Sequence, residues 1–270
     1  MHKKRPGRGL FWLLVLALLA YALIYSNTKV LTRRYTLAFP ALPESFDGWR
    51  AAVVADCHGR YDEDIVKAVA EAEPNLIILA GDIMGDSSQL DDALDFAGKM
   101  KAIGPVCYVT GNHEWTTGVL GAFLDGLARQ GVTVLDNETR IITVDGQTIT
   151  LAGLADPNGP FDMETPAQVL AGVEPSGFTL LVCHRPNGFK QYAELGADLT
   201  VSGHTHGGMV RLPWIGGLMA PGGELLPDMD GGVYEHGGAK LVISRGLAGV
   251  DRFPRLFNPR EVVLVTLKHG

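Results

Sequence analysis

Five short apolar runs in this sequence end in the same way: each is followed at once by side chains that can bind a metal ion. The runs have the length of β-strands and lie at residues 51–55, 76–80, 106–110, 179–183 and 199–202. Such runs are typical of strands buried on both faces, as in a parallel sheet covered by helices. The pattern therefore predicts an α/β fold whose functional groups gather where its strands end.

The segments between these runs have their own patterns. The predicted helices, one after each of the first three runs, lie at residues 61–72, 90–100 and 119–127. Later in the chain, residues 141–151 are a predicted hairpin with Asp145-Gly146 at its turn. The last predicted strands are residues 240–244 and 261–267. Because there is no internal repeat or linker, residues 35–270 are expected to form one domain.

Composition narrows the class of protein. The 270-residue chain is 46% hydrophobic and 20% charged, which excludes a disordered, collagen-like or coiled-coil protein. Residues 1–34 hold seven basic residues and no acidic one, which leaves 16 of the 23 basic residues against 30 acidic ones in residues 35–270, a net charge of −14. A body this acidic lacks the broad positive surface that binds a nucleic-acid backbone, so bulk nucleic-acid binding is excluded.

An uncharged apolar run at residues 10–25 lies between two groups of basic side chains. As a helix this run would span ~24 Å, less than the ~30 Å hydrocarbon core of a bilayer. Gly9 and Ser26 lengthen the run, and flanking Lys and Arg side chains can snorkel to the interface. We predict that residues 9–26 are a single-pass anchor in the cell membrane, within a basic flank and anchor segment at residues 1–34.

Two other interpretations of the run stay open at this point, a cleaved signal peptide and a buried core helix. Ala20-Tyr21-Ala22 has the small-x-small form of a cleavage site, although it lies inside the apolar run rather than after it. Four basic residues precede the run and three follow it, which slightly favours a cytoplasmic N-terminus and a domain outside the cytoplasm.

The side chains that follow the strands are of the types that metal ions of intermediate softness prefer: carboxylate oxygen, amide oxygen and imidazole nitrogen. Ligands bind beyond the carboxyl ends of strands in open α/β sheets, so we expect these loops to converge. Glycines before three of the candidates permit close approach of the backbone. The candidate residues are Asp56, His58, Asp82, Asn112, His113, His184, His204 and His206.

In order along the chain, the blocks are Asp56-x-His58, Gly81-Asp82, Gly111-Asn112-His113-Glu114, His184 and Gly203-His204-x-His206. With these blocks the chain resembles the calcineurin-like metallophosphoesterase superfamily. Ser244-Arg245-Gly246 and the stretch from Arg255 to Pro259 are similar to its membrane-anchored bacterial branch, which includes phosphodiesterases and UDP-2,3-diacylglucosamine pyrophosphatase-like enzymes. The resemblance implies a four-layer α/β/β/α sandwich with two mixed sheets, preceded by one N-terminal transmembrane helix.

The resemblance also implies a role for each candidate. Asp56, His58 and His206 would hold one divalent ion, Asn112, His184 and His204 a second, and Asp82 would bridge both. The ions would be manganese, iron or zinc. A hydroxide held between them would attack phosphorus in line, while His113 would stabilise or protonate the leaving oxygen.

The implied reaction is hydrolysis of phosphodiester or pyrophosphate bonds, with a lipid-linked or nucleotide-sugar substrate suggested by the anchor. The alternatives are a phosphomonoesterase such as a protein phosphatase, and a non-catalytic metal-binding module. Arg245 and Arg255 either reach the substrate phosphate or form salt bridges within the fold. The apolar stretch at residues 212–222 is expected to be a core-packing connection, with a substrate-facing or membrane-facing flap as the alternative. The oligomeric state is left open.

Overall fold

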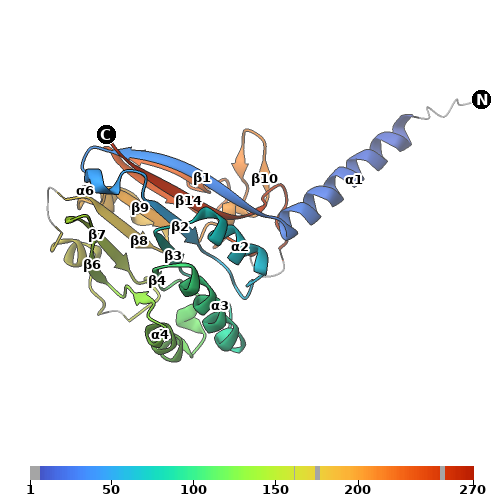
Figure 1. The fold of residues 1–270 in the computed structure, drawn as a ribbon. Helices are drawn as coiled ribbons and strands as arrows, with labels where there is room; N and C mark the ends of the chain where they lie inside the picture. The colour runs from blue at the N-terminus through green and yellow to red at the C-terminus, as the bar shows by residue number, and fades with distance from the viewer. Residues whose placement is uncertain (1–6, 161, 174–176, 250–252) are drawn as a thin grey trace, which may run out of the picture.

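Two six-stranded sheets pack face to face in the part of the chain that the structure describes, residues 7–160, 162–173, 177–249 and 253–270 of a computed structural model (Figure 1). In spatial order, the first sheet contains β1 (Val30–Phe39), β14 (Arg260–His269), β2 (Arg50–Val54), β3 (Leu76–Ala80), β4 (Val106–Val109) and β5 (Thr133–Val134). The second contains β12 (Gly232–His236), β13 (Ala239–Ile243), β9 (Leu199–Ser202), β8 (Thr179–Cys183), β7 (Gln147–Leu154) and β6 (Glu138–Val144). Both sheets mix parallel and antiparallel pairs.

The main hydrophobic core lies between the two sheets. Val53 and Ile78 of the first sheet and Val182 and Val201 of the second are fully buried members of one cluster. The alternate residues of the first sheet face the other way, because successive side chains of a strand point to opposite faces. Those residues pack against helices, which explains why the strands are apolar along their whole length.

Helices cover the outer face of each sheet. α2 (Glu63–Ala72), α3 (Leu90–Ile103) and α4 (Leu120–Arg129) lie on the first sheet. The short helices α5 (Pro166–Leu170) and α6 (Phe189–Glu194) lie on the second. The helix–sheet–sheet–helix order confirms the predicted four-layer sandwich of two mixed sheets.

Most predicted elements are confirmed to within a few residues, the hairpin at Asp145-Gly146 included. The edge strand β1 is different, because the charge pattern assigned its first residues to the basic flank. It pairs in parallel with β14 along its whole length, from Val30 opposite Arg260 to Phe39 opposite His269. Residues 30–34 therefore belong to the sheet, where Arg33 lies 3.7 Å from Glu261. An edge strand tolerates such charges because one of its sides has no neighbouring strand.

The N-terminal helix α1 (Gly7–Thr28) is long and apolar enough to cross a membrane over Gly9–Thr28, with a mean hydropathy of 2.2. Only 11% of this window is buried in the rest of the structure, unlike a core helix. The helix leaves the domain as a separate rod (Figure 1). The basic residues at positions 3–5 lie outside the described residues.

The apolar stretch after the histidine pair is not a core-packing connection, which corrects the expectation for residues 212–222. Its first part forms a narrow hairpin of β10 (Arg211–Leu212) and β11 (Gly216–Gly217), which pair only with each other. Trp214 at the tip is fully exposed and Ile215 is 59% exposed. The tip therefore projects from the fold as an exposed flap.

Candidate metal centre

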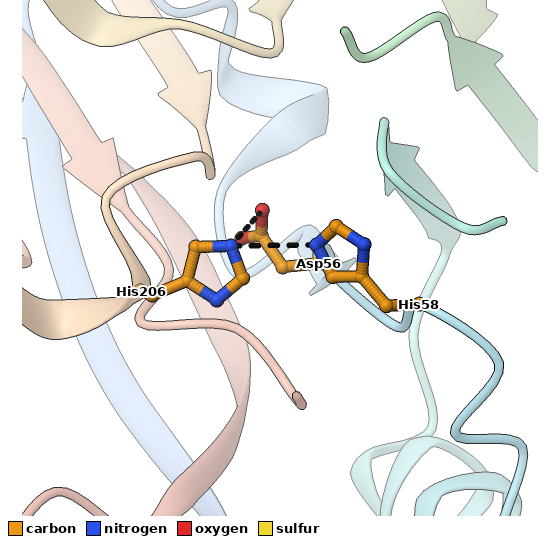
Figure 2. A group of neighbouring side chains, drawn as sticks. All are labelled: Asp56, His58 and His206. Carbon is orange, nitrogen blue, oxygen red and sulfur yellow. Dashed lines mark hydrogen bonds and ion pairs between the residues drawn. The ribbon is translucent and has the colours of Figure 1, made fainter. Parts of the chain in front are cut away.

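The loops that follow β2, β3, β4, β8 and β9 converge at one edge of the two sheets, as the sequence predicts. The Nε2 atom of His206 lies 3.4 Å from Oδ1 of Asp56, and Nε2 of His184 lies 3.1 Å from Oδ2 of Asp82. His58 and His206 approach from opposite sides with Asp56 between them (Figure 2). Ligand-capable atoms lie within 4.8 Å of one another in three groups: Asp56, His58 and His206; Asp82, His184 and His204; and His58, Asp82 and His113.

The orientation of two imidazoles fits a metal site. Nδ1 of His184 lies 2.8 Å from the carbonyl oxygen of Ala80, and Nδ1 of His206 lies 3.1 Å from that of Ala248. A carbonyl only accepts, so each Nδ1 carries the proton, as metal-binding histidines usually arrange. Burial holds the pKa of His206 well below its usual value, so its Nε2 presents a lone pair to the site.

The contacts between the imidazole rings also fit a metal site. Nε2 of His206 lies 3.4 Å from Nε2 of His58, and Nδ1 of His204 lies 3.2 Å from Nε2 of His184. Ring nitrogens that converge on each other and on carboxylate oxygens are held together favourably by a cation. This arrangement fits a dinuclear site for divalent ions.

The side chain of Asn112 is compatible with its predicted role as a ligand. Its side-chain Oδ1 is buried and has no hydrogen-bond partner. Buried polar atoms in folded proteins nearly always have a partner, so an orphaned oxygen next to a cluster of ligands needs an explanation. Coordination of a metal ion would give Oδ1 a partner.

The electrostatics of the centre favour cations, because Asp56, Asp82 and Glu114 are all buried there. Burial and the charge of Asp82 raise the pKa of Asp56 to about 7. Burial disfavours charge on His184, yet Asp82 and Asp56 raise the pKa of that imidazole to about 10. Burial alone would raise the pKa of Asp82, but the charge of His184 lowers it overall. The three carboxylates thus draw positive charge into the centre.

The backbone at the centre is strained. Asp56, His58, Asp82, His204 and His206 all have a positive φ, between 43° and 71°. Each such conformation costs of order 1–3 kcal/mol for a non-glycine residue and persists only where the surroundings fix it. Neighbouring glycines permit the close packing, as predicted: a Cβ on Gly111 would lie 2.2 Å from Oδ1 of Asp82, and one on Gly203 2.7 Å from Oδ2 of Asp56. Such strain is typical of functional sites.

His113 lies at the border of the cluster, next to open space. Its backbone N–H donates to Oδ1 of Asp82 at 2.9 Å, and its ring stands edge-on to that of His58 with centroids 4.6 Å apart. His113 and His58 line a cavity of about 440 Å³ that extends to Asn27 at the end of α1. Its position suits a group that faces a substrate beside the ligands.

Glu114 belongs to a predicted block, but the sequence assigned it no role. Its fully buried carboxylate accepts four backbone N–H groups, from Asp82 at 3.0 Å, Ile83 at 2.6 Å, Met84 at 3.1 Å and Gly111 at 2.9 Å. These bonds tie the loop of Asp82 to the loop of Asn112. The only sequence signal was an acidic residue directly after two metal-capable ones.

Arg255 and Arg245 both make contacts within the fold. Arg255 is fully buried and donates to the carbonyl oxygens of Asn258, Ala248 and Arg245. Since the Ala248 carbonyl also accepts from His206, Arg255 supports a candidate ligand indirectly. Arg245 lies 3.9 Å from Glu261, which agrees with the salt-bridge alternative.

Comparison with known proteins adds independent findings. The sequence model of the calcineurin-like phosphoesterase family matches residues 50–208. The chain is 28% identical over 288 residues to the uncharacterized metallophosphoesterase YkuE of Bacillus subtilis, covering 99% of this chain and 98% of that protein. It is 30% identical over 166 residues to the phosphodiesterase YaeI of Escherichia coli, covering 58% of each. The solved NAD nucleotidase of Haemophilus influenzae resembles it in fold, with a TM-score of 0.50, 15% identity, and 74% of this chain and 50% of that chain covered.

Proposed function

The chain belongs to the calcineurin-like phosphoesterase family and is a metal-dependent hydrolase of phosphoric esters, and we propose that it is a membrane-anchored enzyme for phosphodiester or pyrophosphate bonds. The similarity to a relative named as a phosphodiesterase supports this choice of bond. We further propose lipid-linked or nucleotide-sugar substrates, whose phosphate groups can be reached beside a membrane.

The observation that carries the proposal is the lining of the cavity of about 440 Å³. Its lining includes His58 and His113 of the candidate centre and Asn27, the second-last residue of α1. Arg60 is an exposed cation on the same wall, and Phe253 and Pro254 add apolar surface. A substrate with its phosphate beside His58 and His113 would share this cavity with the base of the predicted membrane helix.

Two divalent ions fit the donor set, with Asp56, His58 and His206 around one, Asn112, His184 and His204 around the other, and Asp82 shared. When bound, such a pair supplies Lewis-acid activation of water and neutralises the charge of a phosphate ester. Imidazole, carboxylate and amide donors suit manganese, iron or zinc.

The protein's own groups would then orient the substrate and move a proton. His113 stands beside the ligands with its ring at the cavity, so it can give a proton to the leaving oxygen as the ester bond breaks. The Asp82 carboxylate fixes the backbone of His113 through the N–H bond of 2.9 Å, which holds the imidazole at that place. Arg60 is placed to attract a second phosphate group of a pyrophosphate.

The test is hydrolysis by the full-length chain in detergent, with manganese, iron(II) and zinc supplied in turn. The substrates are a nitrophenyl monoester, the matching diester, a nucleotide sugar and its acylated form. We expect the diester and the pyrophosphates to be cleaved faster than the monoester. Faster cleavage of the monoester would favour a phosphomonoesterase, and no turnover with any metal would favour a binding module.

We propose that α1 stays attached as the anchor and that the domain faces away from the cytoplasm. Ala22 and Ser26 are buried against the domain, which supports a helix that remains with it. To test the anchor, mass spectrometry of the membrane-extracted protein should find an intact N-terminal region. To test the side of the membrane, protease added to sealed vesicles should digest the domain only from the outer, non-cytoplasmic side. A mature chain that begins near Ser26 would contradict the anchor.

A further inference from the structure

We propose that the domain has a second membrane contact, an apolar surface beside the base of α1 that docks on the lipid bilayer. This docking surface consists of exposed side chains from three stretches of the chain, 214–215, 225–226 and 253–257, namely Trp214, Ile215, Leu225, Leu226, Phe253 and Phe257. The inference rests on the proposed membrane placement of α1, and it goes beyond the anchor because it fixes how the domain sits on the bilayer.

The first observation is that α1 is clamped to the domain. The side chain of Asn27 donates to the carbonyl oxygen of Arg255 at 2.8 Å and accepts from its N–H at 3.1 Å. The hydroxyl of Ser26 accepts from the N–H of Asn258 at 3.1 Å. One residue, Lys29, separates α1 from the first residue of β1. The helix and the domain therefore move as one body, without a flexible linker.

The second observation concerns the length of α1. A helix needs ~20 apolar residues to cross the hydrocarbon core, and the apolar span is the 20 residues Gly9–Thr28. Spanning the bilayer thus requires α1 up to its last turn, where Ser26 and Asn27 contact the domain. Protein surface next to this turn must then lie at the level of the lipid headgroups.

The third observation is that the flap is attached to the same segment as the clamp. The N–H of Arg211 donates to the carbonyl oxygen of Leu256 at 3.0 Å, and Val210 forms a bridge with Leu256. Leu256 lies between the two clamp residues Arg255 and Asn258. The β10–β11 hairpin accordingly projects from the domain on the side that α1 leaves (Figure 1).

The chemistry of the docking surface matches a bilayer interface. Trp214 is fully exposed, Leu225 is 74% exposed and Phe253 is 61% exposed. Grouped exposed apolar side chains are unusual on a soluble domain, whereas aromatic residues concentrate at membrane interfaces. The exposed cations Lys29 and Arg60 lie at the end of α1 and at the cavity beside it, where they can attract anionic headgroups.

The backbone of this surface is also unusual. Trp214, Leu226 and Phe257 have φ values of 65°, 52° and 52°, a left-handed conformation that bulky residues rarely adopt. Phe253 belongs both to the docking surface and to the wall of the cavity at His58 and His113. Docking would therefore bring the mouth of the cavity to the membrane surface.

The experiment measures tryptophan fluorescence of the full-length protein in nanodiscs whose lipids carry bromine on the acyl chains near the headgroup. The fluorescence of each indole is obtained as the difference in signal between the wild type and the variant that replaces that tryptophan. The three variants are Trp214→Phe, Trp12→Phe and Trp49→Phe. Trp12 lies in α1 and reports its insertion, while Trp49 is buried in the core between the sheets and is the unquenched control.

We expect bromine to remove most of the Trp214 signal and to leave the Trp49 signal unchanged. Quenching of Trp12 without quenching of Trp214 overturns the docking surface and leaves the anchor intact. Absence of quenching at both positions overturns the anchor and the docking surface together.

A second variant separates the bilayer from another copy of the chain as the occupant of the surface. The double variant Trp214→Ser and Ile215→Ser should have the melting temperature of the wild type. In detergent it should also have the same oligomeric state as the wild type. Loss of an oligomer in this variant would show that the surface joins two copies, which contradicts docking on lipid.

Discussion

The two sheets contribute different chemistry to the same edge. The loops of the first sheet supply all the oxygen donors of the predicted ligand set, Asp56, Asp82 and Asn112, and one histidine, His58. Those of the second sheet supply histidines alone, His184, His204 and His206. Neither sheet carries a complete set for two ions. The centre can therefore form only when the two sheets pack.

Each sheet also orients the ligands of the other. The carbonyl oxygen of Ala80 in the first sheet fixes the ring of His184, which follows a strand of the second. The backbone N–H of His204 donates to both carboxylate oxygens of Asp56, at 3.0 and 3.1 Å. From this difference we infer that metal binding depends on the packing of the two sheets, and the predictions below test this dependence.

The largest effect is expected for Asp82→Ala, which removes a carboxylate that lies 3.1 Å from His184 and 3.6 Å from His58, one histidine of each group. Each ion supplies several kcal/mol of transition-state stabilisation, so losing both lowers the turnover rate by ~10⁴-fold or more. Metal analysis should find fewer than two ions per chain, while the exposed Asp91→Ala control retains both. Two ions per chain in Asp82→Ala would refute the shared ligand.

His113→Ala should lower kcat by ~10²–10⁴-fold, the usual contribution of a positioned acid, without removing metal. The first sheet would then supply the acid as well as the oxygen donors. The loss should be largest for alkoxide leaving groups and smallest for nitrophenolate, which leaves without a proton. His236→Ala, in the edge strand β12, is the matched control. An equal loss for all leaving groups excludes the acid role, and loss of metal makes His113 a ligand.

Removal of metal by a chelator should destabilise the packing of the two sheets. Ions at 1,000 times their Kd stabilise a folded protein by about 4 kcal/mol, and each kcal/mol shifts Tm by about 2–4 °C in a domain of this size, so Tm should fall by about 8–16 °C. Calorimetry with and without added metal measures the shift. An unchanged Tm would mean that the ions do not link the sheets.

Glu114→Gln should have the smallest effect, because it perturbs only the first sheet's half of the centre. The amide that replaces the carboxylate leaves buried N–H groups of the two loops without a good hydrogen-bond acceptor. This lowers the free energy of unfolding by ~1–3 kcal/mol. Metal affinity should fall by ~10-fold or more, as for other residues that position ligands. Metal titration of this variant is compared with the exposed Glu71→Gln. Equal affinity in both variants would assign Glu114 a purely structural role.

The parts of the fold and of the candidate site that could be predicted are those that leave a local pattern in the sequence. The strands around Val53 and Ile78 and the site candidates after them were predictable, because burial on both faces demands continuous apolar runs and metal ligands demand particular residue types. β1 was not, because its arginines resembled a membrane flank and its partner β14 lies at the other end of the chain.

The sequence by itself determined the α/β class, the apolar N-terminal helix and the residues that follow each strand. Only the tertiary structure decided the burial of Arg255, the four hydrogen bonds of Glu114, the clamp of Asn27 and the exposure of Trp214. The physical reason is that these features depend on contacts between segments far apart in the chain. Local propensity and hydrophobic pattern carry no information about which distant backbone group a side chain will meet.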